Sequence, residues 1–375
     1  MRVIHYPGGK VISEVTMRRN SNFHAHFRRG AMMRAVTRFI LQHVRYALVM
    51  PNTGPIRTIE ELVEYWRELM AIAAEEVDHQ VDLIMTLYFT DLLTPAVIQR
   101  IKEAEAELGI RIEVKWYPPA PGATTGSDFG IPLALGHETL LEMERLDVPL
   151  LGHFEDTEDA YGRVLPPEQR EGHMVEHVLW KFRDQYPMLR HSFEHASTAA
   201  AVEYVKADTS GRTAMTVTPQ HSLFTVEDFD DHGSELKCMP IVKTPEDRAA
   251  IVAFIITGDP RAIAGDDTAP HPHKRKSGPF ADAANGCWLP HSLEMYAEVF
   301  DRERALDERF ERFMSLNGPA WRELPLPGED DTITLRRKKY APIPDPVEIP
   351  GEDDVVVPLG WSPEGSKLNL SFYVV

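Results

Sequence analysis

The segment Arg45-Tyr46-Ala47-Leu48-Val49-Met50 is an apolar run that stops at the turn-forming Pro51-Asn52-Thr53-Gly54-Pro55. A short apolar run bounded by proline and glycine is typical of a strand buried on both faces. Thr58 and Glu61 then have the spacing of a capping box. Behind them, apolar residues recur at the spacing of one helix face: Leu62, Tyr65, Trp66, Leu69 and Met70. The stretch therefore predicts a strand, a short polar loop and an amphipathic helix.

This strand–loop–helix unit recurs along the chain. Residues 83–88 form the next apolar run, Thr94-Pro95 predicts the start of a helix, and Gly109 predicts its end. Residues 111–117 follow as another strand. Further apolar runs end at four positions: His153, His195, Pro219 and Asp267. Strands that alternate with helices predict a parallel sheet with crossover connections.

Counting from Phe23 gives eight predicted strands, the number that closes a TIM barrel. A ninth apolar run at residues 236–241 contains Pro240, which would be awkward in a central strand, so we expect it in a long connection. A doubly wound open sheet is the competing architecture, but no glycine-rich phosphate-binding segment follows the first strand. We therefore predict an α/β fold with a (β/α)8 TIM barrel at residues 1–340 and an extended, proline-rich C-terminal tail at 341–375 that wraps the barrel.

The composition limits the classes of molecule that the chain can bind. A formal charge of -18 over 375 residues argues against binding to nucleic acid or to an anionic membrane, because both need a basic surface. The two cysteines, Cys238 and Cys287, lie far apart without the spacing of a metal site, so we expect a reducing, cytoplasmic environment. Residues 1–9 lack the apolar core of a signal peptide, and the longest apolar run, residues 249–256, is too short to span a bilayer.

Residues suited to metal chemistry stand at the ends of the predicted strands, where a TIM barrel carries its active site. His24 and His26 point to one side only if the segment is extended, and Arg28 follows two residues later on the same side. Because the chain has 16 histidines, this pair alone would be weak evidence. The other strand ends supply further candidates: Asn52, Lys115, His153, His195, Asp267 and His271.

With these residues in this order, the sequence resembles the dihydroorotases, amidohydrolase-superfamily enzymes of pyrimidine biosynthesis, in their single-domain bacterial type. The resemblance covers nearly the whole chain in one unbroken order. It rests on these segments: His24-Ala25-His26-Phe27-Arg28, Val49-Met50-Pro51-Asn52, Lys115-Trp116-Tyr117-Pro118, Ala123-Thr124-Thr125, Leu150-Leu151-Gly152-His153, Phe193-Glu194-His195, Thr218-Pro219-Gln220-His221, Cys238-Met239-Pro240-Ile241, Asp267-Thr268-Ala269-Pro270-His271, and Asn317-Gly318-Pro319 with Leu324-Pro325. It implies a barrel of the metal-dependent hydrolase type, a small-molecule substrate and a homodimer.

The resemblance also implies two zinc ions in each subunit. Six side chains would hold them: His24, His26 and Asp267 for one ion, His153 and His195 for the other, and Lys115 for both. A lysine ammonium can only donate, so Lys115 would have to be carboxylated to a carbamate whose oxygens bridge the ions. A hydroxide between the ions would open the ring of dihydroorotate to N-carbamoyl-L-aspartate, and the reverse steps would close it. Asp267 would act as general base and then as general acid.

A carboxylate on the substrate needs a local cation in this acidic protein. Arg28 can bind a carboxylate through two parallel hydrogen bonds. By resemblance, Asn52 and His271 complete this clamp. Main-chain groups near Met239 and Asn285 would contact the edge of the pyrimidine.

The segment 118–130 is too rich in proline, glycine and threonine to be a helix. It resembles the mobile loop of the family, whose two threonines, here Thr124 and Thr125, would close over the substrate. Two positions depart from the family pattern. Phe154 stands where relatives often have a small residue, which predicts a narrower pocket, and Asn285 also replaces a small residue.

Two other functions stay open. A different cyclic amidohydrolase, for example one for hydantoins or allantoin, would share the metal ligands, although Arg28, Asn52 and His271 favour a substrate with a carboxylate. A non-catalytic homologue that serves as an assembly scaffold usually loses ligands, and none is missing here. Asp266 competes with Asp267 for the same role. The resemblance of residues 267–271 to the family selects Asp267, and strand alternation then places Asp266 on the opposite face.

Two further motifs are expected to be ordinary surface features. Residues 173–177 have the H-x-x-E-H pattern of zinc proteases, but they fall on a polar outer helix without a further ligand nearby. The basic run at residues 273–276 is expected to be a solvated loop beside the site rather than a surface for nucleic acid.

Overall fold

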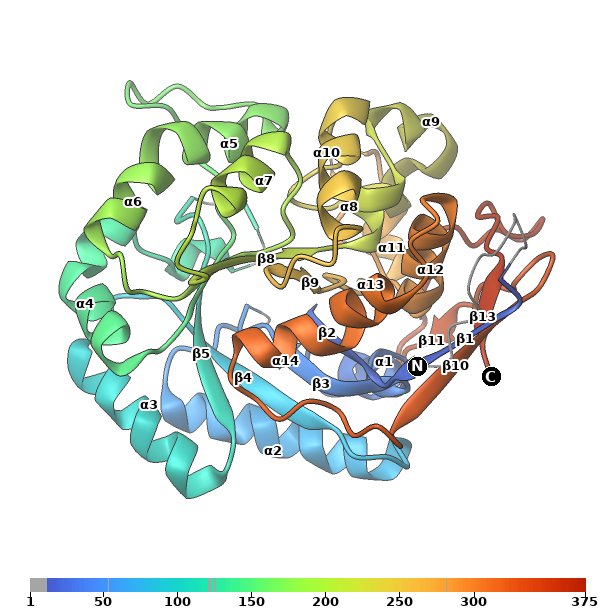
Figure 1. Cartoon of the computed structure of the whole chain (residues 1–375), viewed down its shortest axis with the longest axis horizontal. Coiled ribbons are helices and arrows are strands. Elements are labelled where there is room, and N and C mark those ends of the chain that lie inside the picture. Colours follow the sequence, from blue (N-terminus) through green and yellow to red (C-terminus); the bar gives the residue numbers. More distant parts are fainter. Residues whose placement is uncertain (1–11, 53, 121–122, 125, 281) are drawn as a thin grey trace.

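Eight parallel strands form the centre of the molecule (Figure 1). The computed structural model describes residues 12–52, 54–120, 123–124, 126–280 and 282–375. The strands lie side by side in the order in which they occur in the chain: β2 (Asn20–Ala25), β3 (Val44–Val49), β4 (Asp82–Tyr88), β5 (Arg111–Trp116), β6 (Leu150–Gly152), β7 (His191–Phe193), β8 (Thr213–Val217) and β9 (Ala262–Ala264). A doubly wound sheet reverses its strand order at a switch point, so this order excludes the competing architecture.

The first and last strands approach each other and nearly close the sheet into a barrel. The backbone N–H of Asp267 donates to the carbonyl oxygen of His24 at 3.0 Å, and the N–H of His26 donates to that of Thr268 at 3.0 Å. Ala25 and Thr268 form a parallel bridge between them. The contact therefore lies just beyond the end of β9, and the predicted TIM-barrel-like fold is confirmed.

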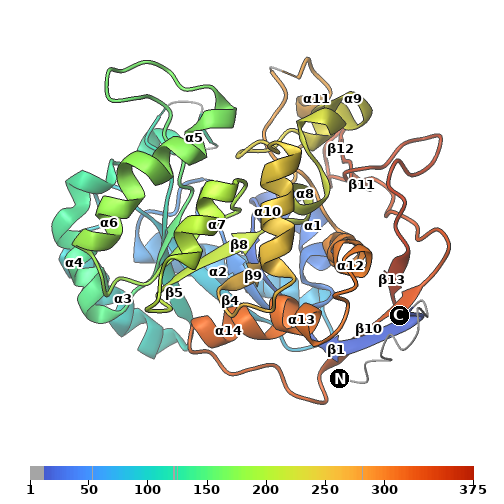
Figure 2. The same ribbon diagram turned by 45° about the horizontal axis from the view of Figure 1, so that its top comes forward.

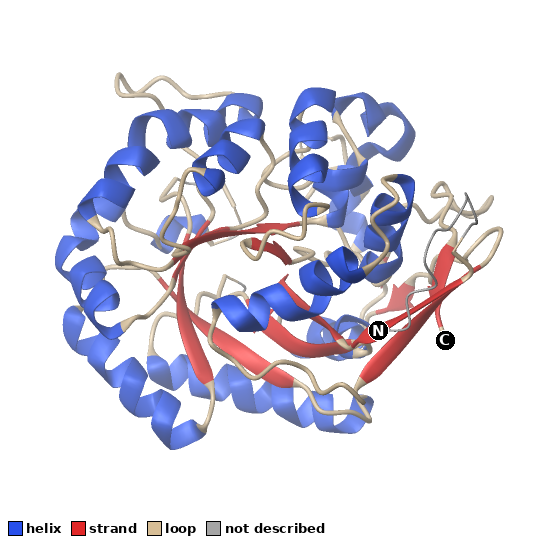
Figure 3. Cartoon of the chain, viewed as in Figure 1, coloured by secondary structure: helices blue, strands red, loops and turns tan. Residues whose placement is uncertain are grey.

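Helices surround this barrel on its outer side (Figure 3). The longer ones are α1 (Gly30–Leu41), α2 (Ile59–Glu76), α3 (Pro95–Leu108), α4 (His137–Leu146), α5 (Pro167–Met174), α7 (Ala199–Lys206), α10 (Pro245–Ile255) and α12 (Ser292–Arg302). The predicted capping box is present: Thr58 Oγ1 accepts from the N–H of Glu61, and the Glu61 carboxylate accepts from the N–H of Thr58. Gly109 ends α3 with a φ of 66°, a conformation that favours glycine.

The apolar run at residues 236–241 is a connection, as predicted from Pro240. Short helical turns lead from β8 into it: α8 (Pro219–Leu223), η4 (Val226–Asp228), α9 (Phe229–His232) and η5 (Gly233–Leu236). No strand occurs between η5 and α10. Cys238 in this connection and Cys287 are both buried and both free.

The N-terminal end of the barrel is closed by α14 (Asn317–Trp321), which contains the Asn-Gly-Pro motif. The side-chain amide of Asn317 donates to the carbonyl oxygen of Ala262, at the start of β9, at 2.8 Å. Gly318 lies against the ring of Phe23 so closely that a Cβ atom would stand 2.0 Å from a ring carbon. Only glycine permits this approach, which seals the interior of the barrel below the strand ends.

Three further strands lie outside the barrel, close to the C terminus (Figures 1 and 2). β1 (Glu14–Arg18), β10 (Thr332–Arg337) and β13 (Phe372–Val374) form an antiparallel sheet with β10 in the middle. The segment 341–375 also contains a two-stranded ladder of β11 (Val347–Glu348) and β12 (Val355–Val356). Across the described parts of the chain, no helix combines the length and the apolar character needed to cross a membrane.

Phe372→Ala is expected to lower the free energy of unfolding by about 3–5 kcal/mol, because the ring is fully buried and the Arg337 guanidinium stacks on it. Denaturant unfolding followed by tryptophan fluorescence measures this difference. Val375, whose side chain is 55% exposed, supplies the control, and Val375→Ala should change stability by no more than about 0.5 kcal/mol. Equal stability of the two variants would show that β13 contributes nothing to the fold.

Candidate metal centre

The two histidines of the H-x-H segment meet Asp267 at the mouth of the barrel. His24 lies in β2 and His26 follows its last residue, so both rings lie on one side of an extended chain. Oδ1 of Asp267 is 3.1 Å from Nε2 of His26 and 3.4 Å from Nε2 of His24. All three side chains are buried, and their ligand atoms lie within 4.8 Å of one another. Since imidazole and carboxylate are common zinc ligands, this cluster is a candidate metal site.

The protonation of these groups suits a metal. Burial lowers the pKa of His24 well below its usual value and also lowers the pKa of His26, so each ring keeps a lone pair. Burial by itself raises the pKa of Asp267, but the neighbouring His24 and His26 imidazoles outweigh this effect and lower the pKa overall. Asp267 is therefore a carboxylate that can bind a cation or accept a proton.

His153 and His195, which follow strands β6 and β7, lie beside the same cluster. His153 directly follows β6 and His195 is the second residue after β7, and their ring centroids lie 4.5 Å apart. The His195 ring centroid is 4.9 Å from that of His24. The four histidines predicted from three strand ends thus form one contiguous group.

Lys115, in β5, is fully buried. Its Nζ has no hydrogen-bond partner among the described residues and lies 4.6 Å from the centroid of the Tyr117 ring. Burial lowers the pKa of Lys115 to about 8, with Glu194 and Asp267 acting in the opposite sense. An amine with a pKa this low is partly unprotonated near neutral pH, and an unprotonated amine can react as a nucleophile.

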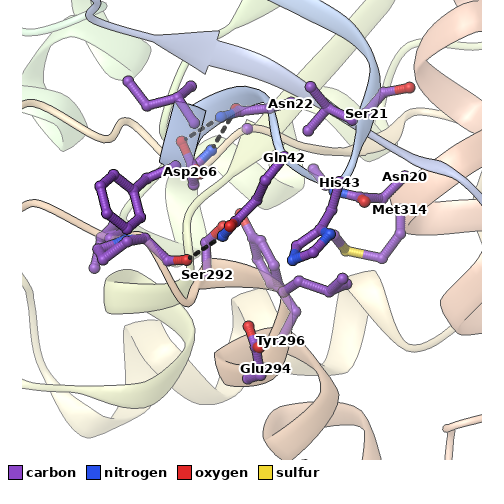
Figure 4. A pocket seen from close by; sticks show the side chains of 18 residues that line it. Asn20, Ser21, Asn22, Gln42, His43, Asp266, Ser292, Glu294, Tyr296 and Met314 are labelled. Carbon is purple, nitrogen blue, oxygen red and sulfur yellow. Dashed lines mark hydrogen bonds between the residues drawn. The ribbon is translucent and has the colours of Figure 1, made fainter. Parts of the chain in front are cut away.

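Asp266 points away from the metal cluster, as strand alternation predicted. Its Oδ1 accepts hydrogen bonds from Nδ2 of Asn22 at 2.7 Å and from the N–H of Thr268 at 3.0 Å. Figure 4 shows Asp266 beside Asn22 in a separate polar pocket on the other side of the chain. Burial raises the pKa of Asp266 to about 7, whereas that of Asp267 is lowered. The two neighbouring aspartates therefore have different environments and different chemistry.

Arg28 and His271 form a buried pair next to the cluster. Nη2 of Arg28 lies 3.1 Å from Nε2 of His271, and Nε of Arg28 donates to the carbonyl oxygen of Pro270 at 2.8 Å. Nε2 of His271 is also 2.6 Å from the carbonyl oxygen of Asn285. Because a carbonyl can only accept, we assign the ring hydrogen of His271 to Nε2. Burial lowers the pKa of Arg28 to about 10, so Arg28 remains a cation at neutral pH.

Asn52 contacts a metal-ligand candidate directly. Its Oδ1 is 2.7 Å from Nδ1 of His26, so it accepts from that ring and leaves Nε2 of His26 to face Asp267. The side-chain amide of Asn52 also lines the pocket. Asn52 can thus orient His26 and still donate to a bound ligand.

The cluster opens into one pocket that most of the predicted site residues line. These residues are His24, His26, Arg28, Asn52, Thr124, His153, His195, Met239, Asp267 and Asn285. Thr125 lies outside the described residues. Tyr117 also lines the pocket and was missed by the sequence analysis. Its position two residues after Lys115 in an extended chain was the signal that could have identified it.

Phe154 does not narrow this pocket, so that prediction is wrong. Its ring packs outside the pocket against Phe193, at 5.2 Å between centroids, and against Trp116, at 5.9 Å. Strand alternation explains the error, because the residue after a ligand faces the helices instead of the interior. The H-x-x-E-H pattern also lies apart from the cluster, and Nδ1 of His173 pairs there with Asp156 at 2.7 Å.

The basic run at residues 273–276 is a helical turn, α11 (His273–Lys276), and not the expected solvated loop. Lys276 is buried, and its Nζ donates to the carbonyl oxygens of Lys237 at 3.0 Å and Gly286 at 2.9 Å. This ammonium therefore joins the two chain segments that carry Met239 and Asn285 to the pocket.

Three site residues have a left-handed backbone although none is glycine. The φ angles are 65° at Arg28, 42° at His195 and 50° at Asp267. Such conformations cost on the order of 1–3 kcal/mol each and persist where the surroundings enforce them. They turn the chain sharply at strand ends and aim these three side chains into the pocket.

Two buried glutamates hold the predicted ligands and were missed as site residues. Oε2 of Glu194 lies 2.6 Å from Nδ1 of His24, and Oε2 of Glu155 lies 2.8 Å from Nε2 of His153. Glu155 stands two residues after its histidine, which is a signal that the sequence contained. Glu194 is 170 residues away from His24, so only the fold reveals that pair.

Known proteins resemble the chain along most of its length, although no protein-family model matches it. It is 37% identical over 350 residues to a dihydroorotase of Halorhodospira halophila, covering 92% of this chain and 95% of that protein. It is 35% identical over 366 residues to a dihydroorotase of a Picosynechococcus species, covering 96% and 99%. A solved dihydroorotase of Saccharomyces cerevisiae, in complex with 5-fluoroorotic acid, superposes with a TM-score of 0.82 at 25% identity, covering 97% of this chain and 99% of that one.

His26→Ala is expected to lower the amount of zinc that the protein retains. It removes one of the three side chains of the cluster, which His24, His26 and Asp267 form together. Metal content after dialysis against zinc-containing and then zinc-free buffer measures the loss. His173→Ala is the matched control, since His173 belongs to the H-x-x-E-H pattern away from the cluster, and it should leave the metal content unchanged. Loss of zinc from the His173 variant alone would place the site elsewhere.

Proposed function

The chain belongs to the dihydroorotase family of cyclic amidohydrolases, and from this premise we propose that it interconverts L-dihydroorotate and N-carbamoyl-L-aspartate with two zinc ions in this pocket. The observation that carries the proposal is one pocket that contains both the buried histidine–aspartate cluster and the buried cation Arg28. The first would hold the metal, and the second would hold the carboxylate that both substrates carry.

The residues present fit a pair of metal ions. Four buried nitrogens near one another have no hydrogen-bond partner among the described residues: His24 Nε2, Lys115 Nζ, His153 Nδ1 and His195 Nδ1. Buried polar atoms left without a partner are costly, so this set indicates an absent ligand for them. We propose that His24, His26 and Asp267 hold one zinc ion, and that His153 and His195 hold the other.

Lys115 would join the two ions as a carbamate. Its Nζ is buried, lacks a hydrogen-bond partner among the described residues and has a lowered pKa, which supports reaction of the free amine with carbon dioxide. Carboxylation converts a donor into two oxygen acceptors and removes the positive charge beside the histidines. The new negative charge would then be balanced by the two cations.

Asp267 would move the proton during the reaction. When bound, the zinc pair would supply an ionised water as nucleophile and would polarise the amide carbonyl of the ring. Asp267 would accept the remaining proton of that water and deliver it to the ring nitrogen as the carbon–nitrogen bond breaks. In ring closure, the same carboxylate would take the proton from the attacking nitrogen. The lowered pKa of Asp267 favours the carboxylate form that this role requires.

Arg28, Asn52 and His271 would bind the substrate carboxylate. The buried guanidinium of Arg28 can form charge-assisted hydrogen bonds, and the ring of His271 lies beside it. Asn52 would add an amide donor while it holds His26. A neutral cyclic amide such as a hydantoin would offer this buried cation no carboxylate, which disfavours that alternative.

The remaining pocket residues would complete the site around the ring. Main-chain groups at Met239 and Asn285 would contact the pyrimidine edge, and Thr124 and Thr125 would close over the substrate and exclude water. Lys276 supports the role of Met239 and Asn285, because its ammonium bonds to both of the segments that carry them. The role of the two threonines is supported by Thr124, which lines the pocket.

We further propose that residues 1–340 form the barrel domain, that 341–375 form a tail packed on it, and that the protein is a cytoplasmic homodimer. The buried Phe372 and the pairing of β13 with β10 support the tail assignment. The two free cysteines suit a reducing compartment. The family resemblance supports the dimer, which sedimentation analysis would test.

Zinc-loaded protein is expected to hydrolyse L-dihydroorotate and to form it from N-carbamoyl-L-aspartate, as measured by the ultraviolet absorbance of the ring. Asp267→Asn should lower kcat by about 10²–10⁴-fold, because it removes the proton acceptor. Asp266→Asn is the matched control and should retain most of the activity. Turnover of hydantoin but not of dihydroorotate would contradict the assigned substrate, and no turnover in either direction would favour the scaffold.

Lys115→Ala is expected to lose binding of the zinc pair and activity, and to regain part of both with a small carboxylic acid such as acetate. The acid would fit the space of the missing side chain and supply two bridging oxygens. Lys115→Met is the matched control, because it fills that space with an apolar chain and should not be rescued. Full activity of the alanine variant without added acid would show that no carbamate is needed.

A further inference from the structure

The interior of the barrel below the metal cluster contains charged side chains. Glu113, Lys115, Glu194 and Arg322 are all fully buried there. Apolar side chains surround them, among them Phe23, Leu48, Ile84, Leu151, Ala214 and Ile263. A buried charge is costly unless it is paired, so each of the four groups needs a partner. Lys115 has a role in the proposed function, and the contacts of the other three are described next.

Glu194 contacts one half of the proposed metal site directly and is linked to the other half through Thr216. Its Oε2 accepts from Nδ1 of His24 at 2.6 Å, which leaves Nε2 of that ring to face Asp267. The hydroxyl of Thr216 donates to the same oxygen at 3.1 Å, and it accepts from the backbone N–H of His195 at 2.7 Å. One carboxylate thus fixes the ring of His24 and, through Thr216, the strained backbone of His195.

Arg322 supplies a counter-charge from the floor of the barrel. Its Nε lies 3.0 Å from Oε1 of Glu113, and its guanidinium stacks on the ring of Phe23 at 4.4 Å. Phe23 directly precedes His24, and Gly318 in α14 leaves room for its ring. The charge of Arg322 is thus paired with Glu113. Burial raises the pKa of Glu194, and the charges of Lys115 and Arg322 act in the opposite sense.

We propose that Glu194 is a positioning residue for the metal site, which orients the ring of His24 and, through Thr216, the backbone of His195. A carboxylate behind a ligating histidine fixes its tautomer and ring orientation and strengthens its binding to metal. This inference rests on the proposed function, because it takes His24 and His195 as ligands.

The test is zinc affinity, measured on metal-free protein by competition with a chromophoric chelator. Glu194→Gln retains the size of the side chain but loses its charge, and it should weaken zinc binding by about 10–100-fold. Thr216→Val, which removes the bridging hydroxyl, should also weaken it. The zinc-loaded Glu194→Gln enzyme should show a lower kcat and an unchanged KM for dihydroorotate, because Glu194 touches no substrate.

Two matched variants separate positioning from general stability. Glu311→Gln alters another buried carboxylate, which accepts from the backbone N–H of Arg18 at 3.0 Å, far from the ligands. Thr86→Val removes another buried hydroxyl, which donates to the carbonyl oxygen of Val49. Both controls should bind zinc within twofold of the unmodified protein, even where the melting temperature of the metal-free form falls.

The outcomes distinguish this inference from the function on which it rests. Zinc binding by the unmodified protein, with equal affinity in the Glu194→Gln and Thr216→Val variants, would overturn the positioning role alone. Absence of zinc binding by the unmodified protein would overturn the proposed function as well. Equal weakening in the Glu311 and Thr86 controls would reduce the effect to lost stability and would also overturn the inference.

Discussion

The site depends on the way in which the barrel closes. The backbone hydrogen bonds between the segment after β9 and the end of β2 place Asp267 beside His24 and His26, although 241 positions separate Asp267 from His26 in the sequence. The strand register determines where each of these side chains lies, so their contact follows from the backbone pairing. The left-handed backbone at Asp267 and Arg28 then turns both side chains into the same pocket. The fold thus supplies the geometry before any metal binds.

Burial is the second constraint, and it acts differently on each group. It lowers the pKa of the histidines and of Lys115, which leaves lone pairs and a free amine. It raises the pKa of Asp266 to about 7, whereas the imidazoles beside Asp267 reverse the effect there. The pKa values of two adjacent aspartates therefore shift in opposite directions, because both are buried and only Asp267 has imidazoles beside it. In an acidic chain, such local contrasts determine the chemistry more than the net charge of -18 does.

The sequence was sufficient for the architecture and for the groups that share a strand end. Eight apolar runs, their helix signals and Pro240 identified the barrel strands, because strand ends and helix caps are local features. The family resemblance selected Asp267 over Asp266, and strand alternation placed Asp266 on the opposite face. The sequence was not sufficient where a contact joins distant strands, as between Glu194 and His24. It was also not sufficient for Phe154, whose side chain points away from the pocket. Lys276 was misjudged for a similar reason, since its burial depends on carbonyl groups from two other segments.

The two ends of the barrel differ in their access to a ligand, and the buried arginines Arg28 and Arg322 differ accordingly. At the mouth, Arg28 lines the pocket, so its charge can meet a ligand. At the floor, Arg322 is sealed by α14 and cannot meet a ligand, so its charge can serve only its protein neighbours. A buried Arg–Glu pair seldom adds stability over an apolar pair of similar size. Its contribution beneath the proposed metal ligands is placement, because the Arg322 guanidinium stacks on the ring of Phe23, the residue that directly precedes His24.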